Sequence, residues 1–233
     1  MFDLIAFDAD DTLWHHERLY VRAQDKFQKL LSSYADGAMV VQSLYEKETR
    51  NLELYGYGIK SFALSMIETA IGLTRGEIRG AEIQQIIGLA REMLTSPVQL
   101  FEHAEETVCE LAKSYALMVI TKGDLLDQQS KLSRSGLEDY FRSVEIVSEK
   151  AQGTYAVLLA KHGIEPQRFL MVGNSLKSDI LPVLALGGHA VYIPYHLTWA
   201  HETVDSQPVG HDDYYELEHL GQLPLLIERL SCR

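Results

Sequence analysis

The chain has 233 residues, of which 46% are hydrophobic, and carries 21 basic against 33 acidic side chains. This composition is typical of a globular protein with one large domain, or with a core and a smaller domain. The net charge of -12 argues against a nucleic-acid backbone or an anionic membrane as partner. It is compatible with a small phosphorylated substrate, because a metal ion and one or two lysines offset charge locally.

The sequence favours a cytoplasmic protein. No apolar run approaches the ~18 residues of a membrane-spanning helix. The N-terminal segment has an acidic residue as early as Asp3 and no basic stretch, which does not fit a signal peptide. The two cysteines, Cys109 and Cys232, have no metal-ligand spacing, so free thiols in a reducing compartment are favoured. We found no signal for an oligomeric state.

The first stretch of interest is an apolar run, residues 4–7, that ends in Asp8, Asp10, Asp11 and Thr12. A short apolar run bounded by polar residues is typical of a buried strand. Residues two apart on a strand point the same way, so Asp8 and Asp10 are expected to aim at one point. Two close carboxylates keep their charges only with a cation or a shared proton between them. A solvated turn or a loop around a structural cation is the alternative.

Helical spacing replaces the strand pattern from residue 15 to residue 98. Thr74 and Glu77 have the spacing of a capping box and predict the start of the last helix. We therefore predict an inserted domain of four helices over 15–98. Its apolar residues recur three or four apart in four groups: Tyr20, Ala23, Phe27, Leu30, Leu31 and Tyr34; Val40, Leu44 and Tyr45; Ala63, Met66, Ile67, Ala70 and Ile71; and Ile83, Ile86, Ile87, Ala90 and Met93.

Helices and strands alternate after His103, which indicates a parallel sheet with helices on both faces. The predicted strands are residues 117–120, 144–147, 169–172 and 190–193. Residues 194–210 have no clear period and are expected to form a surface loop, and residues 216–230 are expected to be helical. The predicted fold is α/β, with a Rossmann-like parallel-sheet core, residues 1–14 and 99–233, and an inserted α-helical domain.

Polar groups follow four of the predicted strands, at the edge where ligands bind in open parallel sheets. Together they supply a carboxylate nucleophile, a second carboxylate, a hydroxyl donor, an ammonium group and oxygen ligands for a metal. Phosphoryl transfer needs such groups, because it depends on positioning and on neutralising charge. These residues are Asp8 and Asp10, Thr121, Lys150, and Asn174 with Asp179.

The same positions resemble the signature of the haloacid dehalogenase superfamily, in its phosphatase branch. Asp8-x-Asp10-x-Thr12 matches the first motif, and Thr121 and Lys150 match the second and third. Gly173-Asn174-Ser175-x-x-x-Asp179 resembles the fourth motif. The match covers residues 1–14 and 100–195, and the helical insertion resembles the cap domain of the family.

The resemblance implies a role for each catalytic position. Asp8 would attack phosphorus and form an aspartyl-phosphate. Asp10 would protonate the leaving oxygen and then activate water; dehalogenases lack this aspartate, so Asp10 favours a phosphatase. Thr121 would donate to a phosphoryl oxygen, and Lys150 would offset the charge of Asp8 and the phosphate.

Magnesium is the cofactor that the resemblance implies. Its protein ligands would be Asp8, the backbone carbonyl of Asp10, Asn174 and Asp179. Most phosphatases of the family have aspartate in place of Asn174, so this chain departs from the pattern by one negative charge. We predict a functional but weaker metal site.

Candidate substrate contacts are Thr12, Lys122, Gly123 and Lys60. Lys60 and Arg50 both lie in or near a turn of the cap that is interrupted by glycines. Solvated surface charge is the alternative for Lys60 and Arg50, and Lys122 is similarly ambiguous.

Two further features have plain structural alternatives. Trp14 is expected to line the entrance to the site or to pack on the cap. The nine histidines, including the pairs His15–His16 and His196–His201, favour surface or packing roles over a metal site.

The predicted function is a magnesium-dependent phosphatase that acts on a small soluble phosphomonoester, such as a sugar phosphate or a nucleoside monophosphate. A phosphomutase shares every motif and stays open. A binding or regulatory protein that kept the fold and lost turnover also stays open, and Asn174 is the feature that favours it.

Overall fold

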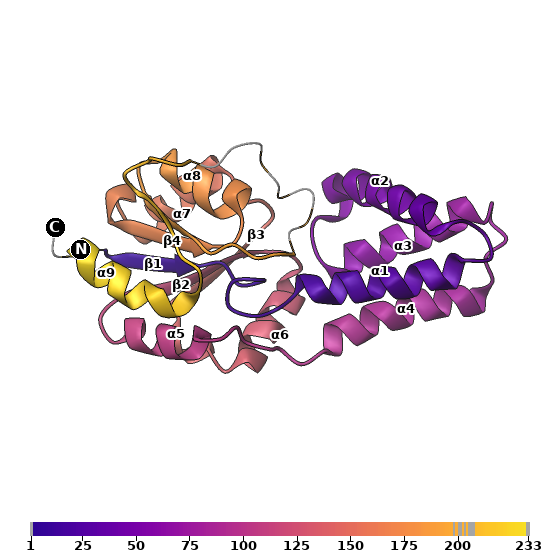
Figure 1. The fold of residues 1–233 in the computed structure, drawn as a ribbon, viewed down its shortest axis with the longest axis horizontal. Helices are drawn as coiled ribbons and strands as arrows, with labels where there is room; N and C mark the ends of the chain where they lie inside the picture. The colour runs from indigo at the N-terminus through magenta and orange to yellow at the C-terminus, as the bar shows by residue number, and fades with distance from the viewer. Residues whose placement is uncertain (1, 198, 200–201, 203, 205–207, 232–233) are drawn as a thin grey trace. The chain divides into compact units, whose positions relative to one another are not determined.

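The computed structural model describes residues 2–197, 199, 202, 204 and 208–231, which form two compact units (Figure 1). The core unit consists of Met1–Glu17, Val98–Lys122 and Gln128–Arg233. The helical unit consists of Arg18–Pro97 together with Gly123–Asp127, the short segment that follows the second strand.

The core unit is built on a sheet in which the described residues form six parallel strands in the order β3-β2-β1-β4-β5-β6. The central strand β1 pairs with β2 and β4, and Phe7 lies opposite both Val119 and Val172. The residues that follow these three strands therefore meet at one edge. The strands are β1 (Leu4–Phe7), β2 (Ala116–Lys122), β3 (Ser143–Val147), β4 (Phe169–Gly173), β5 (His189–Tyr192) and β6 (Tyr214–Glu216).

Helices cover both faces of this sheet, which confirms the predicted α/β fold. Helices α5 (Ala104–Ala112), α6 (Leu125–Ser135) and α9 (Leu223–Ser231) pack on the face that carries Ile5 and Phe7. Helices α7 (Gln152–His162) and α8 (Leu181–Leu184) pack on the opposite face, with Leu4 and Ala6 (Figure 1). Successive residues of a strand face opposite sides, so every residue of β1 is buried.

The helical unit contains α1 (Glu17–Leu31), α2 (Gly37–Tyr55), α3 (Ile59–Leu73) and α4 (Gly80–Thr95). Helix α2 begins at a cap in which the Asp36 side chain accepts a hydrogen bond from Met39 N at 2.9 Å. The four helices share one apolar cluster, because the residues that recur three or four apart face inward. Its fully buried members include Phe27, Leu31, Val40, Met66, Ala70 and Ile86.

Two local predictions were wrong. Thr74 ends α3 instead of starting α4: its hydroxyl donates to Ala70 O at 2.8 Å. Helix α4 begins at Gly80, and the carboxylate that caps it is Glu82, which accepts a hydrogen bond from Arg79 N at 2.9 Å. Strand β6 was also not predicted, because three edge-strand residues carry too little periodicity to be recognised.

Among the residues that the structure describes, no helix combines the length and apolarity that a membrane crossing requires. Cys109 is a free thiol. Cys232 and His201 lie outside the described residues.

The helical unit contains a buried carboxyl group whose ionisation should weaken the fold. Glu48 lies on the buried face of α2, is 8% exposed, and burial raises its pKa from 4.5 to about 7. The folded chain thus binds the Glu48 proton more tightly than the unfolded chain, so stability should fall as pH rises from about 4.5 to about 7.

We expect Glu48→Gln to raise the free energy of unfolding by roughly 3 kcal/mol at pH 8 and to have little effect at pH 4. Urea unfolding at both pH values measures this difference. Glu53→Gln, on the exposed side of the same helix, is the matched control and should change little at either pH. An equal effect of Glu48→Gln at both pH values would contradict the account.

Candidate active site

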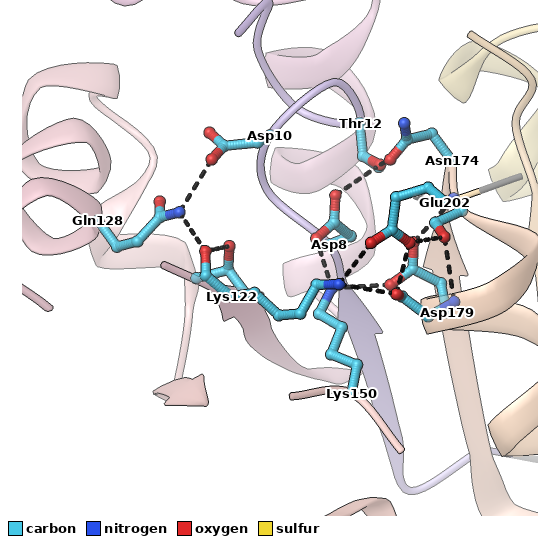
Figure 2. Close-up of polar contacts among 12 residues, drawn as sticks. Asp8, Asp10, Thr12, Lys122, Gln128, Lys150, Asn174, Asp179 and Glu202 are labelled. Carbon is cyan, nitrogen blue, oxygen red and sulfur yellow. Dashed lines mark hydrogen bonds and ion pairs between the residues drawn. The ribbon is translucent and has the colours of Figure 1, made fainter. Parts of the chain in front are cut away.

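Asp8 directly follows β1. Its backbone amide continues the strand pairing by donating a hydrogen bond to Val172 O at 2.9 Å. One carboxylate oxygen accepts a hydrogen bond from Lys150 Nζ, and the other accepts one from Thr12 Oγ1 at 3.1 Å (Figure 2). Burial is the main influence on the pKa of Asp8 and raises it; Lys150 opposes this, and Asp179 adds to it. The arrangement suits a carboxylate nucleophile, because a cation and a hydroxyl hold it in place.

Lys150 is buried between two carboxylates. Its Nζ donates to Asp179 Oδ1 at 2.7 Å as well as to Asp8, and its side chain is 1% exposed. Burial alone would lower the pKa of Lys150, but Asp179 and Asp8 raise it above its usual value, so the amine is charged. With both carboxylates ionised, one ammonium group leaves a negative charge that a second cation could balance.

Asp179 is fixed by the loop that follows β4. Its Oδ2 accepts a hydrogen bond from the backbone amide of Ser175 at 3.0 Å. Gly173 makes this approach possible, because a Cβ at that position would lie 2.3 Å from Asp179 Oδ2. The glycine of the fourth motif is therefore explained by the space that the carboxylate occupies.

The Thr12 hydroxyl lies between Asp8 and Asn174. Its oxygen is 3.1 Å from Asp8 Oδ2 and 3.2 Å from Asn174 Oδ1. Because a hydroxyl has one proton, these two acceptors share it. Through Thr12, the side-chain oxygens of Asp8, after β1, and of Asn174, after β4, therefore lie close together.

Asp10 has a separate set of partners, of which Figure 2 labels Gln128. Trp14 Nε1 donates to its Oδ1 at 2.7 Å, Lys131 Nζ lies 2.7 Å from both oxygens, and Gln128 Nε2 donates to Oδ2 at 2.9 Å. Burial opposes ionisation, but the charges of His16 and Lys131 and the hydrogen bonds hold the pKa of Asp10 well below its usual range. Burial lowers the pKa of His16 to about 4, so Lys131 supplies the positive charge at neutral pH.

The expectation that Asp8 and Asp10 aim at one point is therefore not met in this conformation. The chain turns after Asp8, with a hydrogen bond from Leu13 N to Ala9 O at 2.8 Å and a φ of 61° at Asp11. The strand alternation on which the expectation rested ends at Asp8. Asp11 has a structural role, because its carboxylate accepts hydrogen bonds from two backbone amides, those of residues 16 and 17.

Thr121 and Lys122 end β2 at the same edge of the sheet. The Thr121 hydroxyl is buried and has a long contact, 3.4 Å, with Lys122 O. The Lys122 ammonium donates to Ser178 Oγ at 2.9 Å and to Glu202 at 2.6 Å. Glu202 also accepts from the hydroxyls of Ser175 and Ser178. Burial opposes ionisation of Glu202, but Lys122 and these hydroxyls lower its pKa to about 2.

Comparisons with known proteins show the family of the chain. Residues 2–187 match the model of the haloacid dehalogenase-like hydrolase family. The chain belongs to this family. In the solved structure of a haloacid dehalogenase-like family hydrolase from Xanthomonas campestris, a chain that is 40% identical superposes with a TM-score of 0.88, covering 99% of this chain and 92% of that one.

Curated relatives of this hydrolase include phosphatases. The N-acylneuraminate-9-phosphatase of Rattus norvegicus is 25% identical over 98% of this chain and 95% of its own length. The glyceraldehyde 3-phosphate phosphatase of Methanothermobacter thermautotrophicus is 33% identical over 43% of this chain and 47% of its own length.

Two residues named as substrate contacts lie in the helical unit of the hydrolase. Gly123 has a φ of 134°, which favours glycine, and opens the segment Gly123–Asp127. Lys60 Nζ contacts Asp124 Oδ1 of this segment at 2.9 Å, so Lys60 has an ion-pair partner within its own unit.

Trp14 is a core residue. It is 1% exposed and belongs to the apolar cluster of the core unit, which does not fit a place at an entrance to the site. Its indole N–H fixes Asp10 instead. His15 packs against Phe101 with ring centroids 3.9 Å apart, a packing role.

Sequence reasoning missed Gln128, Lys131 and Glu202. Gln128 lies four residues before the buried Leu132 on α6, so its place on the inward face of that helix was a usable signal. Lys131, three residues after Gln128, shares that face. Glu202 lies in a stretch without periodicity, where no signal marks it.

Gly173→Ala tests the close approach of Asp179. The added methyl group must displace that carboxylate and with it the contact to Lys150, which should lower the free energy of unfolding by about 1–3 kcal/mol. Gly153→Ala is the control, since nothing lies within 4 Å of the added methyl group, and alanine at this helical position should stabilise slightly. Urea unfolding compares the two variants. Equal stabilities would show that Asp179 is not constrained by Gly173.

Proposed function

We propose that this hydrolase is a magnesium-dependent phosphatase that acts on a small phosphomonoester through an aspartyl-phosphate on Asp8. The observation that carries the proposal is the Asp8 carboxylate, buried and held between Lys150 and Thr12 at the end of the central strand. The phosphatases among its relatives support the reaction class.

Two displacements would make up the reaction. In the first, a carboxylate oxygen of Asp8 forms a bond to phosphorus, the ester O–P bond breaks, and Asp10 gives its proton to the leaving oxygen. In the second, water forms a bond to phosphorus, the bond to Asp8 breaks, and the proton of the water goes to Asp10. The products are an alcohol and inorganic phosphate.

The low pKa of Asp10 favours its ionised form, which is the form that the second displacement needs. The first displacement needs a proton on Asp10. Nearby negative charge raises the pKa of a carboxyl group, so the arrival of a phosphate dianion favours uptake of that proton.

Other residues would neutralise and orient the phosphoryl group. Lys150 offsets the charge on Asp8, and the Thr121 hydroxyl, whose contact with Lys122 O is long, is free to turn toward a phosphoryl oxygen. Thr12, Lys122 and Gly123 are proposed substrate contacts on the basis of the motif match. Lys122 would have to leave Glu202 to serve in this way.

The oxygen atoms near Asp8 fit a magnesium ion. The side chains of Asp8 and Asn174 converge on Thr12, and Lys150 supplies one positive charge for two carboxylates. Asp8, the backbone carbonyl of Asp10, Asn174 and Asp179 would hold the ion, which prefers such oxygen ligands. When bound, magnesium supplies positive charge that offsets the phosphoryl oxygens.

The proposed substrate is a small soluble metabolite such as a sugar phosphate or a nucleoside monophosphate. The net charge of -12 disfavours nucleic acids and anionic membranes, and the names of the related phosphatases point to phosphorylated sugars. We propose that the helical unit is the cap that selects this substrate and that the enzyme works in the cytoplasm.

Asp8→Asn tests the nucleophile. An amide oxygen is a poor nucleophile, so magnesium-dependent release of phenolate from an aryl phosphate should fall to background. Asp139→Asn, at an exposed position, is the matched control and should retain wild-type turnover. If the Asp8 variant turned over at the wild-type rate, Asp8 would not be the attacking group. A phosphomutase would move phosphate between positions of a sugar without releasing it.

Asn174→Asp tests the metal site. The added charge should lower the magnesium concentration that gives half-maximal turnover, and calorimetry should show tighter magnesium binding. In chelator, the variant should be less stable than the wild type, because the new carboxylate lies near Asp8. An unchanged magnesium requirement would rule out Asn174 as a ligand.

A further inference from the structure

Three donor groups converge on one carboxylate at the edge of the sheet. Lys122 Nζ donates to Glu202 Oε1 at 2.6 Å (Figure 2). The hydroxyls of Ser175 and Ser178 donate to the other oxygen, Oε2, the second of them at 2.6 Å. We refer to the side chains of Lys122, Ser175 and Ser178 as the donor cluster. Because it supplies one charge and holds both oxygens, the donor cluster matches a carboxylate group.

The donor cluster is held together without the help of Glu202. The backbone amide of Ser178 donates to Ser175 Oγ at 3.0 Å, and Lys122 Nζ donates to Ser178 Oγ at 2.9 Å. Each hydroxyl therefore accepts one hydrogen bond and has its proton left for an anion. Both serines are buried in the core unit. The arrangement of the three donors thus depends on the loop after β4 and on the end of β2.

A short series of direct contacts joins the donor cluster to Asp8. The backbone amide of Ser175 donates to Asp179 Oδ2 at 3.0 Å. The other oxygen of Asp179 accepts from Lys150, which also donates to Asp8. Lys122 comes from the end of β2 and the serines follow β4, and β1 lies between these two strands. The Lys122 side chain therefore passes the end of β1, and the donor cluster lies beside the proposed phosphoryl site.

Glu202 can be exchanged for another carboxylate at little electrostatic cost. It reaches the donor cluster from the stretch between β5 and β6. The side chains of Lys122 and Glu202 are 13% and 15% exposed, so solvent reaches this ion pair. A second carboxylate in the same place keeps the largely buried ammonium of Lys122 paired, whereas a neutral group removes the contact at 2.6 Å.

We propose that the donor cluster binds a carboxylate group of the substrate, in exchange for Glu202. This inference rests on the function proposed above and narrows it. The substrate is a phosphomonoester that also carries a carboxylate, such as a phosphorylated hydroxy acid or sugar acid. Its phosphoryl group lies at Asp8 and its carboxylate accepts hydrogen bonds from the donor cluster. An ester with an alcohol in place of the carboxylate leaves Glu202 where it is and gains none of these bonds.

Two pairs of esters test this preference, because the members of each pair differ only in the group in question. D-3-Phosphoglycerate has a carboxylate where the glycerol phosphate of the same configuration has a hydroxymethyl group. 6-Phosphogluconate and glucitol 6-phosphate repeat the comparison in a longer molecule. The quantity measured is the ratio of kcat/KM for the acid to kcat/KM for the alcohol, with saturating magnesium. In the wild type this ratio should be about ten or more for at least one pair, as expected of hydrogen bonds to a charged group.

Two variants should move this ratio in opposite directions. Ser178→Ala removes one donor and should lower the ratio about tenfold. Glu202→Gln replaces the competing carboxylate by a neutral amide and should raise the ratio, through a lower KM for the acid. The matched controls, Ser130→Ala and Glu218→Gln at exposed positions, should keep the wild-type ratio. A purely structural role of these contacts would change both esters of a pair alike and leave the ratio as it is.

Three results would overturn the inference. The first is a wild-type ratio near one for both pairs, the second is an unchanged ratio in Ser178→Ala, and the third is a lower ratio in Glu202→Gln. If the serine variant does not fold, the glutamine variant decides, because a ratio that does not rise would also overturn the inference.

The proposed function is tested separately by hydrolysis of an aryl phosphate. If the enzyme hydrolyses none of the four esters, calorimetric titration of the wild type with the same esters and magnesium decides the role of the donor cluster. Tighter binding of an acid than of its alcohol, with the difference reduced in Ser178→Ala, would support it. Equal binding within both pairs would overturn it.

Discussion

The interaction on which the site depends is the ammonium group of Lys150, buried between the carboxylates of Asp8 and Asp179. A buried charge is unfavourable unless it is paired and hydrogen-bonded, so each of these three groups is stable only with the others in place. The sheet supplies two of them: Asp8 directly follows β1, and Asp179 is held by the loop after the neighbouring β4. Because one cation faces two anions, the site retains negative charge, which a metal ion can balance.

Two carboxylates two residues apart are prepared for different roles by their surroundings. Asp8 has one cation, shared with Asp179, and burial raises its pKa. Asp10 has Lys131 and several neutral donors, which hold its pKa low. The cause is the turn that begins after Asp8, which sends the second side chain toward α6. This difference in surroundings is what the proposed division between nucleophilic attack by Asp8 and proton transfer by Asp10 requires.

Much of this site could be predicted from the sequence, because its main residues follow apolar strands. The positions of Asp8, Thr121 and Asn174 at one sheet edge require only the strand pattern and the parallel topology. The same pattern placed Lys150 and Asp179 there, and the motif match added the roles expected of these residues. Contacts that depend on side-chain direction could not be predicted in this way. Strand alternation gave the wrong direction for the side chain of Asp10. The hydrogen bond that Trp14, a core residue, donates to that carboxylate was not predicted.

The partners contributed by α6 were missed for a related reason. A polar helix is normally interpreted as solvated, yet Gln128 and Lys131 are buried because they face Asp10. The contact of Glu202 with Lys122 could not be predicted either, because Glu202 lies in an irregular stretch of the chain. Local periodicity identifies which faces are buried, but not which buried polar groups find one another across the fold.

The central claim is that Asp8 becomes phosphorylated during turnover. The most direct measurement is acid quenching of the enzyme during turnover of an aryl phosphate with magnesium, followed by peptide mass spectrometry. The account predicts a phosphoryl group on the peptide that contains Asp8, labile to hydroxylamine and absent from Asp8→Asn. Sustained turnover with a phosphoryl group on another residue, or with none trapped under any quench time, would contradict it.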